Sequence, residues 1–198
     1  LTRRDAVKAL GSLGYADEAI LLGLFQLAQD SRLDDWICRD ATQALGQLGH
    51  NNEAVLFNLL QLAQDSRMSF RASHAAAQAL GSLGNADETV VFSLLQLTQN
   101  SHVSNGIRYA AAQALGSLGY ADAAIVSGLL RLAQDDRLGS LVRHAAAEAL
   151  GELGCVDETV VSSLLQLAQD SSVEGLVRRA AAQALGKLGL SNQATLLL

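Results

Sequence analysis

Few side chains in this sequence carry groups that commonly do chemistry, and the histidines come first. They are His50, His74, His102 and His144. Only His74 and His144 occupy matching places in the sequence, and they are 70 residues apart. A zinc ion holds its ligands at about 2 Å, whereas stacked helical units that far apart in sequence lie about 20 Å from each other. We therefore expect no metal site and no bound cofactor.

Two cysteines, Cys38 and Cys155, offer thiol chemistry. A disulfide requires Cα atoms within about 7 Å, and more than three units of a stack would separate these two residues. We predict two free thiols without a catalytic role. Because sparse cysteine usage suits a reducing compartment, we also expect a cytoplasmic location.

Acidic pairs and glycine-rich strings recur instead of standing alone. The pairs Asp17-Glu18, Asp87-Glu88 and Asp157-Glu158 are periodic, and carboxylates at helix N-termini serve as caps and favour the helix dipole. The string Gly11-Ser12-Leu13-Gly14 lacks the lysine and hydroxyl residue of a phosphate-binding loop. We interpret its glycines as helix ends, and the sequence predicts a protein that is not an enzyme.

The charges exclude two classes of partner. There are 14 Lys and Arg residues against 20 Asp and Glu residues, a net charge of −6, with no basic cluster along the sequence. Nucleic-acid binding requires clustered cations, and a membrane span requires about 20 apolar residues in a row. We expect neither a nucleic-acid nor a membrane partner.

A repeat of 35 residues organises the whole chain. The string Ala-Leu-Gly-x-Leu-Gly occurs six times in strict register. Its first glycine is Gly11, Gly46, Gly81, Gly116, Gly151 or Gly186. Each copy is predicted to form two helices. The first helix, for example 35–48, has one apolar face, and the second helix follows a position that is Asp or Asn in every copy. We predict that this position is the N-cap, held by Asp17, Asn52, Asp87, Asp122, Asp157 and Asn192.

A two-helix unit cannot bury its apolar face alone, so the copies must stack. We predict an all-α fold, a right-handed α-α superhelix, in which 1–198 form one solenoid of about five and a half repeats. The units are about 1–33, 34–68, 69–103, 104–138, 139–173 and 174–198. Neither terminal unit has a polar outer face, so we expect a fragment of a longer chain.

Residues 176–189, Leu-Val-Arg-Arg-Ala-Ala-Ala-Gln-Ala-Leu-Gly-Lys-Leu-Gly, resemble the first helix of a HEAT-like repeat of the phycobilisome-lyase type. The resemblance implies a ladder between an Asp in the turn and an Arg in the next helix, here Asp135 with Arg143 and Asp170 with Arg178. Cys38 and Ser73 replace the arginine in two copies. The resemblance also implies that the second helices line the concave surface.

Function is expected where the copies differ. One position of the second helices reads Leu22, Phe57 and Phe92 and then changes to serine in the next two copies. We predict that these apolar side chains face solvent and form an interaction surface. Its neighbours are Gln26, Gln61, Gln96 and Arg131. The expected partner is a protein or peptide segment, or a neighbouring domain of the same parent chain.

The first helices have an outward position of their own, which we interpret as a solvated convex face. It holds Arg4, Arg39, His74, Tyr109, His144 and Arg179. Trp36 stands where a first helix begins, and we expect it to fill a gap between units.

These observations favour a non-catalytic interaction scaffold, or a sensor-type repeat domain of the kind that the resemblance implies in large bacterial proteins. The resemblance also leaves a HEAT-like bilin lyase or chromophore-binding protein as an alternative. A third interpretation is an engineered consensus array, which the strict register favours. Scattered odd residues such as Trp36, Phe70 and Asn105 argue instead for natural duplication.

Overall fold

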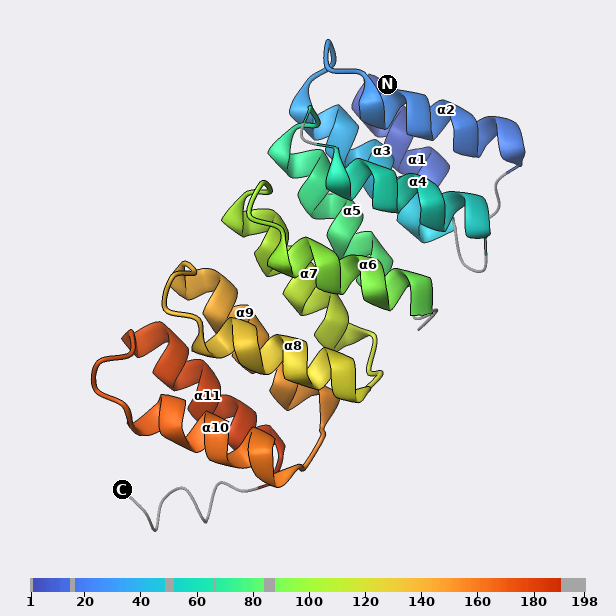
Figure 1. Cartoon of the computed structure of the whole chain (residues 1–198). Helices are drawn as coiled ribbons and strands as arrows, with labels where there is room; N and C mark the ends of the chain where they lie inside the picture. Colours follow the sequence, from blue (N-terminus) through green and yellow to red (C-terminus); the bar gives the residue numbers. More distant parts are fainter. Residues whose placement is uncertain (1, 15–16, 49–51, 66, 84–87, 190–198) are drawn as a thin grey trace.

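The computed structural model describes residues 2–14, 17–48, 52–65, 67–83 and 88–189. Within these residues the chain forms eleven helices and no strand (Figure 1). The first helices are α1 (Arg3–Gly11), α3 (Asp35–Leu48), α5 (Phe70–Ser82), α7 (Asn105–Ser117), α9 (Ser140–Leu153) and α11 (Gly175–Lys187). The second helices are α2 (Glu18–Gln29), α4 (Glu53–Gln64), α6 (Glu88–Gln99), α8 (Ala123–Gln134) and α10 (Glu158–Gln169). None of the helices that the structure describes is long and apolar enough to cross a membrane.

The second helices begin at the predicted caps. Asp17 accepts a hydrogen bond from the Ile20 backbone amide at 2.8 Å. Equivalent side-chain caps are formed by Asn52, Asp122 and Asp157. Bonds from Thr159 hold the pKa of the Asp157 carboxyl below its usual range, as expected for a carboxylate that accepts helix amides. The N-cap prediction is confirmed at these four positions, while Asp87 and Asn192 lie outside the described residues.

The two glycines of each repeated string have different roles, which corrects our interpretation of both as helix ends. The second glycine does follow the helix: Gly154, for example, ends α9 with a φ of +67°, a conformation that glycine adopts without strain. Gly49 and Gly84 lie outside the described residues. The first glycine lies within its helix and contacts the next first helix. A Cβ atom at Gly81 would lie 2.6 Å from the Ala114 backbone.

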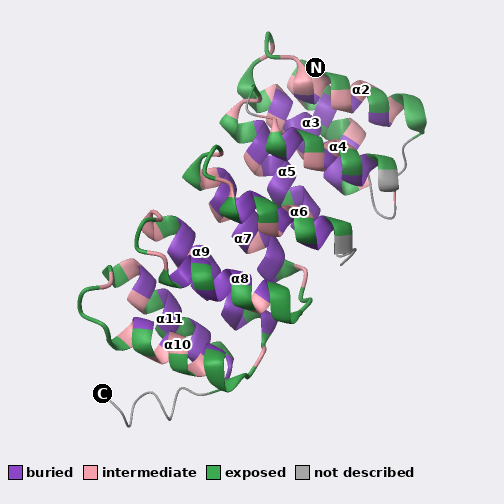
Figure 2. Ribbon diagram, in the orientation of Figure 1, coloured by how far each residue is buried: buried purple, intermediate pink, exposed green. Residues whose placement is uncertain are grey.

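The helices form two layers of an all-α solenoid. Each first helix packs against the next first helix, and each second helix packs against the first helix that follows it in sequence. Figure 2 shows the buried residues concentrated along the first helices. The helices that pack in pairs are therefore a second helix and the first helix that follows it, as in α2 with α3 and α4 with α5. The units at 34–68 and 69–103 describe the sequence repeat, and each of these packing pairs includes one helix from each of two successive units.

The spacing within the two layers differs, and this difference sets the curve. Neighbouring first helices pack closely along the stack, whereas the backbones of neighbouring second helices lie farther apart (Figure 1). Glycine and alanine permit the close approach: a Cβ atom on the first glycine of five successive strings would come within 2.9 Å of an alanine in the next first helix. Units that are closer together on one side bend toward that side. The first helices therefore line the inner side of the curve, and the expectation of concave second helices is wrong.

Candidate interaction surfaces

Two exposed faces run along the solenoid, one on each layer. We call the exposed side of the second helices the outer ridge, which holds Leu22, Phe57 and Phe92 with Gln26, Gln61, Gln96 and Arg131. We call the exposed side of the first helices the inner face. It includes Arg4, Trp36, Arg39, Phe70, Arg71, His74, Tyr109, His144 and Glu148.

The outer ridge contains the residues that the sequence analysis selected. Leu22, Phe57 and Phe92 are 53%, 67% and 61% exposed, which confirms that they face solvent. The predicted neighbours Gln26, Gln61, Gln96 and Arg131 are also exposed. The three apolar side chains stand on three separate helices, α2, α4 and α6. No ring contact joins Phe57 and Phe92 among the described residues.

The inner face carries a contiguous row of aromatic rings across two neighbouring first helices. The Phe70 and His74 ring centres are 5.5 Å apart, and the His74 and Tyr109 rings stack at 6.5 Å with an interplanar angle of 6°. The Phe70 ring lies against Gly106, where a Cβ atom would collide with it. His74 Nδ1 lies 3.2 Å from the Gly106 carbonyl oxygen. Packing thus holds these rings in place while Phe70 stays 52% exposed.

Trp36 belongs to a second cluster on the same face. The guanidinium carbons of Arg4, Arg39 and Arg71 lie 5.2, 5.3 and 3.9 Å from the centre of its ring. These distances are within the range of cation–π attraction. Trp36 is 37% exposed, so most of its surface is covered, and it lies between arginines of the preceding and following first helices.

Arg4 has a further partner in Asp40, a buried carboxylate on α3. Arg4 Nε donates to Asp40 Oδ2 at 2.6 Å, and Lys8 Nζ lies 3.7 Å from the same oxygen. The Asp40 side chain is only 2% exposed. A buried carboxylate requires a paired positive charge. Arg4 and Lys8 of α1 supply that charge to Asp40 of α3.

Two carboxylates lie near Tyr109 on the inner face. Burial raises the pKa of the Tyr109 hydroxyl, and the neighbouring carboxylates Glu148 and Glu152 raise it further. His144 Nε2 lies 3.1 Å from Glu148 Oε2. Its Nδ1 atom is buried without a hydrogen-bond partner in the described structure. Cations follow on α11, where Lys187 Nζ lies 3.5 Å from Glu152 Oε1 and Arg179 is exposed.

Arg143 does not form the predicted ladder with Asp135. Its Nε donates to the Ala133 carbonyl oxygen at 3.1 Å, and its Nη1 donates to Glu174 Oε2 at 2.7 Å. Asp135 instead accepts a hydrogen bond from the backbone amide of Arg137 at 3.0 Å, within its own turn. Among the described residues, no ion pair joins Asp170 and Arg178 either; the pKa of Asp170 is lowered mainly by hydrogen bonds from Ser172.

The residues at the Arg143 position in the three preceding copies also contact backbone carbonyl oxygens, with different side-chain chemistry. Arg108 Nε donates to the Asn100 carbonyl oxygen at 2.9 Å, Ser73 Oγ donates to that of Leu62 at 3.0 Å, and Cys38 Sγ lies 3.5 Å from that of Asp30. Each side chain satisfies a carbonyl near the end of the preceding second helix, where such groups lack helical partners. This position is therefore structural.

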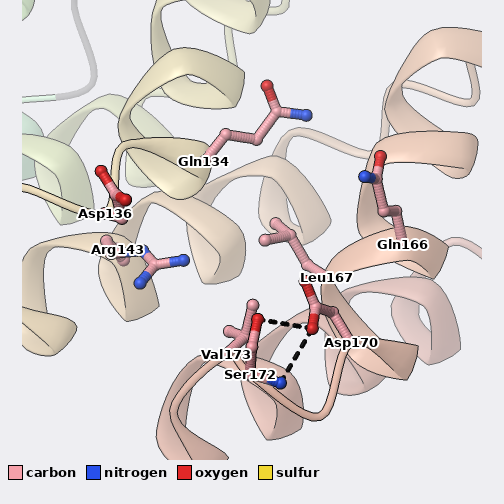
Figure 3. A pocket seen from close by; sticks show the side chains of 8 residues that line it. All are labelled: Gln134, Asp136, Arg143, Gln166, Leu167, Asp170, Ser172 and Val173. Carbon is pink, nitrogen blue, oxygen red and sulfur yellow. Dashed lines mark hydrogen bonds between the residues drawn. The ribbon is translucent and has the colours of Figure 1, made fainter.

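A polar cavity of about 550 Å³ lies beside Arg143 (Figure 3). Its lining residues are Gln134, Asp136, Arg143, Gln166, Leu167, Asp170, Ser172 and Val173. Asp170 Oδ1 accepts bonds from the backbone amide and the hydroxyl of Ser172. Because Arg143 is already bonded to Ala133 and Glu174, the cavity presents no unpaired cation to a ligand. Among the described residues, which exclude His50, no three His, Cys, Asp or Glu side chains form a group that could hold a metal ion.

Comparison with known proteins agrees with the repeated architecture. The family of HEAT repeats matches residues 59–151, 93–186 and 140–198, which together cover more than half of the chain. No curated protein matches the sequence.

Several solved structures share the fold. The CpcE–CpcF complex of phycocyanin lyase from Nostoc has a TM-score of 0.64 and 22% identity, covering 89% of this chain and 68% of that chain. Human deoxyhypusine hydroxylase has a TM-score of 0.56 and 19% identity, covering 94% and 79%. A designed armadillo repeat protein has a TM-score of 0.51 and 15% identity, covering 93% and 92%. At these identities the similarity shows the fold alone, so the lyase and engineered-array interpretations stay expectations.

Proposed function

The chain belongs to the HEAT repeat family, and we propose that it is a non-catalytic scaffold that binds a protein segment along its inner face. The observation that carries this proposal is the row formed by Phe70, His74 and Tyr109. These rings connect two neighbouring units into one surface, as an extended ligand requires.

The composition of the row suits a protein partner. Aromatic side chains dominate the energetics of protein interfaces because they bury a large area at a small entropic cost. Phe70 and Tyr109 are held by neighbouring groups before any partner binds: Phe70 lies against Gly106, and Gln113 Nε2 donates to the Tyr109 hydroxyl at 2.8 Å. Such pre-organisation reduces the cost of binding.

The outer ridge is a second candidate surface for the same function. Phe57 and Phe92 are more than half exposed, and the equivalent residues Ser127 and Ser162 show that the fold accepts a small polar group there. Their separation on different helices suits a neighbouring domain with several contact points better than one continuous segment.

Selection of binding peptides from a random display library tests the proposal and distinguishes the two surfaces. We expect peptides selected on this chain to bind the Phe70→Ala, Tyr109→Ala double variant at least about tenfold more weakly. The matched control is the Phe57→Ser, Phe92→Ser double variant, which places the residue of later repeats on the outer ridge and should bind as the parent does.

Three results would contradict the inner-face proposal. The first is a library that yields no binder, and the second is a set of binders whose affinity is unchanged in the Phe70→Ala, Tyr109→Ala variant. The third is a loss of affinity in the outer-ridge variant alone. Circular dichroism of each variant establishes that the helices are intact before affinities are compared.

A further inference from the structure

We propose that Arg4, Arg39 and Arg71, arranged around Trp36, form a binding site for the carboxylate side chains of an acidic protein segment. This inference rests on the proposed function, because it names the chemistry of the segment that the inner face binds. The three arginines come from three successive first helices, α1, α3 and α5, so the site exists only in the stacked array.

The cluster holds more positive charge than its own carboxylate neutralises. Asp40 accepts from Arg4 and lies near Lys8. Arg39 and Arg71 form no ion pair or hydrogen bond within the described part of the chain. Like charges around one ring repel each other, and an anion placed between the guanidinium groups relieves that repulsion.

The other acidic groups nearby, Asp34 and Asp35, form no ion pair with these arginines in the described structure. Asp34 Oδ1 accepts a hydrogen bond from the Trp36 backbone amide at 2.8 Å, which commits it to the start of α3. Asp35 is exposed one helical turn before Arg39 on α3, and it helps to raise the pKa of the Cys38 thiol. Neither carboxylate is paired with Arg39 or Arg71.

The repeat itself does not require these residues. Trp36 and Arg71 occupy the same position of the repeat, and α7 and α9 have Gly106 and Leu141 there. At the position of Arg39, the same two helices have Tyr109 and His144. Those units fold in the same way without a cation cluster. Trp36 is the only tryptophan of the chain. Trp36, which the other copies of the repeat lack, is therefore free to serve binding.

The arrangement favours a carboxylate-bearing protein segment over a nucleic acid. A guanidinium group binds a carboxylate through two parallel hydrogen bonds, and the neighbouring Phe70 offers an apolar contact beside the charge. A nucleic-acid backbone would need cations along its whole path. On the inner face, Glu148 and Glu152 instead interrupt the cations near Tyr109.

Trp36 provides a direct signal for the test because its fluorescence reports this site alone. The probe is a short glutamate-rich peptide, and the control peptide has glutamine in place of each glutamate. We expect the glutamate peptide to change the Trp36 fluorescence in a saturable way that weakens with added salt. The glutamine peptide should bind at least about tenfold more weakly.

Variants identify the residues responsible. The Arg39→Gln, Arg71→Gln double variant should bind the glutamate peptide at least about tenfold more weakly. Arg71→Lys, which keeps the charge without the planar fork, should bind with intermediate affinity. The matched control is Arg137→Gln, an exposed arginine in the loop before α9, which should bind as the parent does. Circular dichroism confirms folding of each variant.

Equal binding of the glutamate and glutamine peptides, or of the parent and the double arginine variant, would overturn the inference. So would tighter binding of a single-stranded oligonucleotide than of the glutamate peptide. If selected peptides depend on Phe70 and Tyr109 but not on the arginines, the scaffold proposal stands and this inference fails. If they depend on neither group, both fail.

Discussion

Phe57 and Leu59 lie two residues apart on α4 and face opposite environments. Phe57 is 67% exposed, whereas Leu59 is completely buried. We expect Phe57→Ser to change the free energy of unfolding by less than about 0.5 kcal/mol. Leu59→Ala should lower it by about 2–5 kcal/mol because it leaves a cavity. Urea denaturation of both variants measures the difference, and a cost above about 1 kcal/mol for Phe57→Ser would show that this side chain supports the fold.

The two thiols should differ in reactivity. Cys38 is 3% exposed, and burial raises its pKa, with Asp35 contributing in the same direction. Since the thiolate is the reactive form, Cys38 should be alkylated by iodoacetamide far more slowly than the partly exposed Cys155. Mass spectrometry of the modified chain at mildly alkaline pH follows both sites. In concentrated urea the two rates should converge; equal rates in the folded chain would contradict the burial of Cys38.

The exposure of Leu22, Phe57 and Phe92 could be predicted from the sequence because helical periodicity alone decides which side of a helix meets the core. The cluster around Trp36 could not be predicted in the same way. Its arginines come from three helices, so their meeting depends on the spacing and rotation between units. The available signal was the presence of arginine and tryptophan at outward positions that change in later copies.

At the level of the helix, the first glycine of the repeated string sets the distance between units. A Cβ atom at Gly116 in α7 would lie 2.8 Å from the Ala149 backbone, whereas no described atom lies within 4 Å of one at Gly186 in α11. Gly116→Ala should therefore destabilise the chain by about 1–3 kcal/mol through overpacking. Gly186→Ala, at the equivalent position, should stabilise it by up to about 1 kcal/mol through higher helix propensity.

Thermal or urea unfolding of these two alanine variants checks the prediction with each acting as the control for the other. If the Gly116→Ala variant proved as stable as the Gly186→Ala variant, Gly116 would not be required for the close packing of α7 on α9.

The helices and their caps were predictable because local signals specify them: an Asp or Asn at the N-cap and a glycine after the last turn. The partner of each helix was not. The linker between a second helix and the next first helix looked like a boundary between units, but α2 packs on α3 and α4 packs on α5. The sequence therefore predicted which helices form, but it did not show which of them pack against each other.

For the whole molecule, the direction of the curve decides which face an extended partner meets. The prediction of a stacked all-α solenoid is confirmed by the eleven described helices and the family match. The prediction of concave second helices came from the resemblance and was wrong because the small residues lie on the first helices. The glycine and alanine positions are visible in the sequence, but their effect on curvature depends on contacts between units.

The most direct test of the account maps the binding surface by NMR, with a peptide selected on this chain added to the isotope-labelled protein. We predict that the indole N–H of Trp36 and the amides of α3, α5 and α7 shift on binding, while those of α2, α4 and α6 change little. Shifts centred on Leu22, Phe57 and Phe92, with the first helices unaffected, would contradict binding at the inner face.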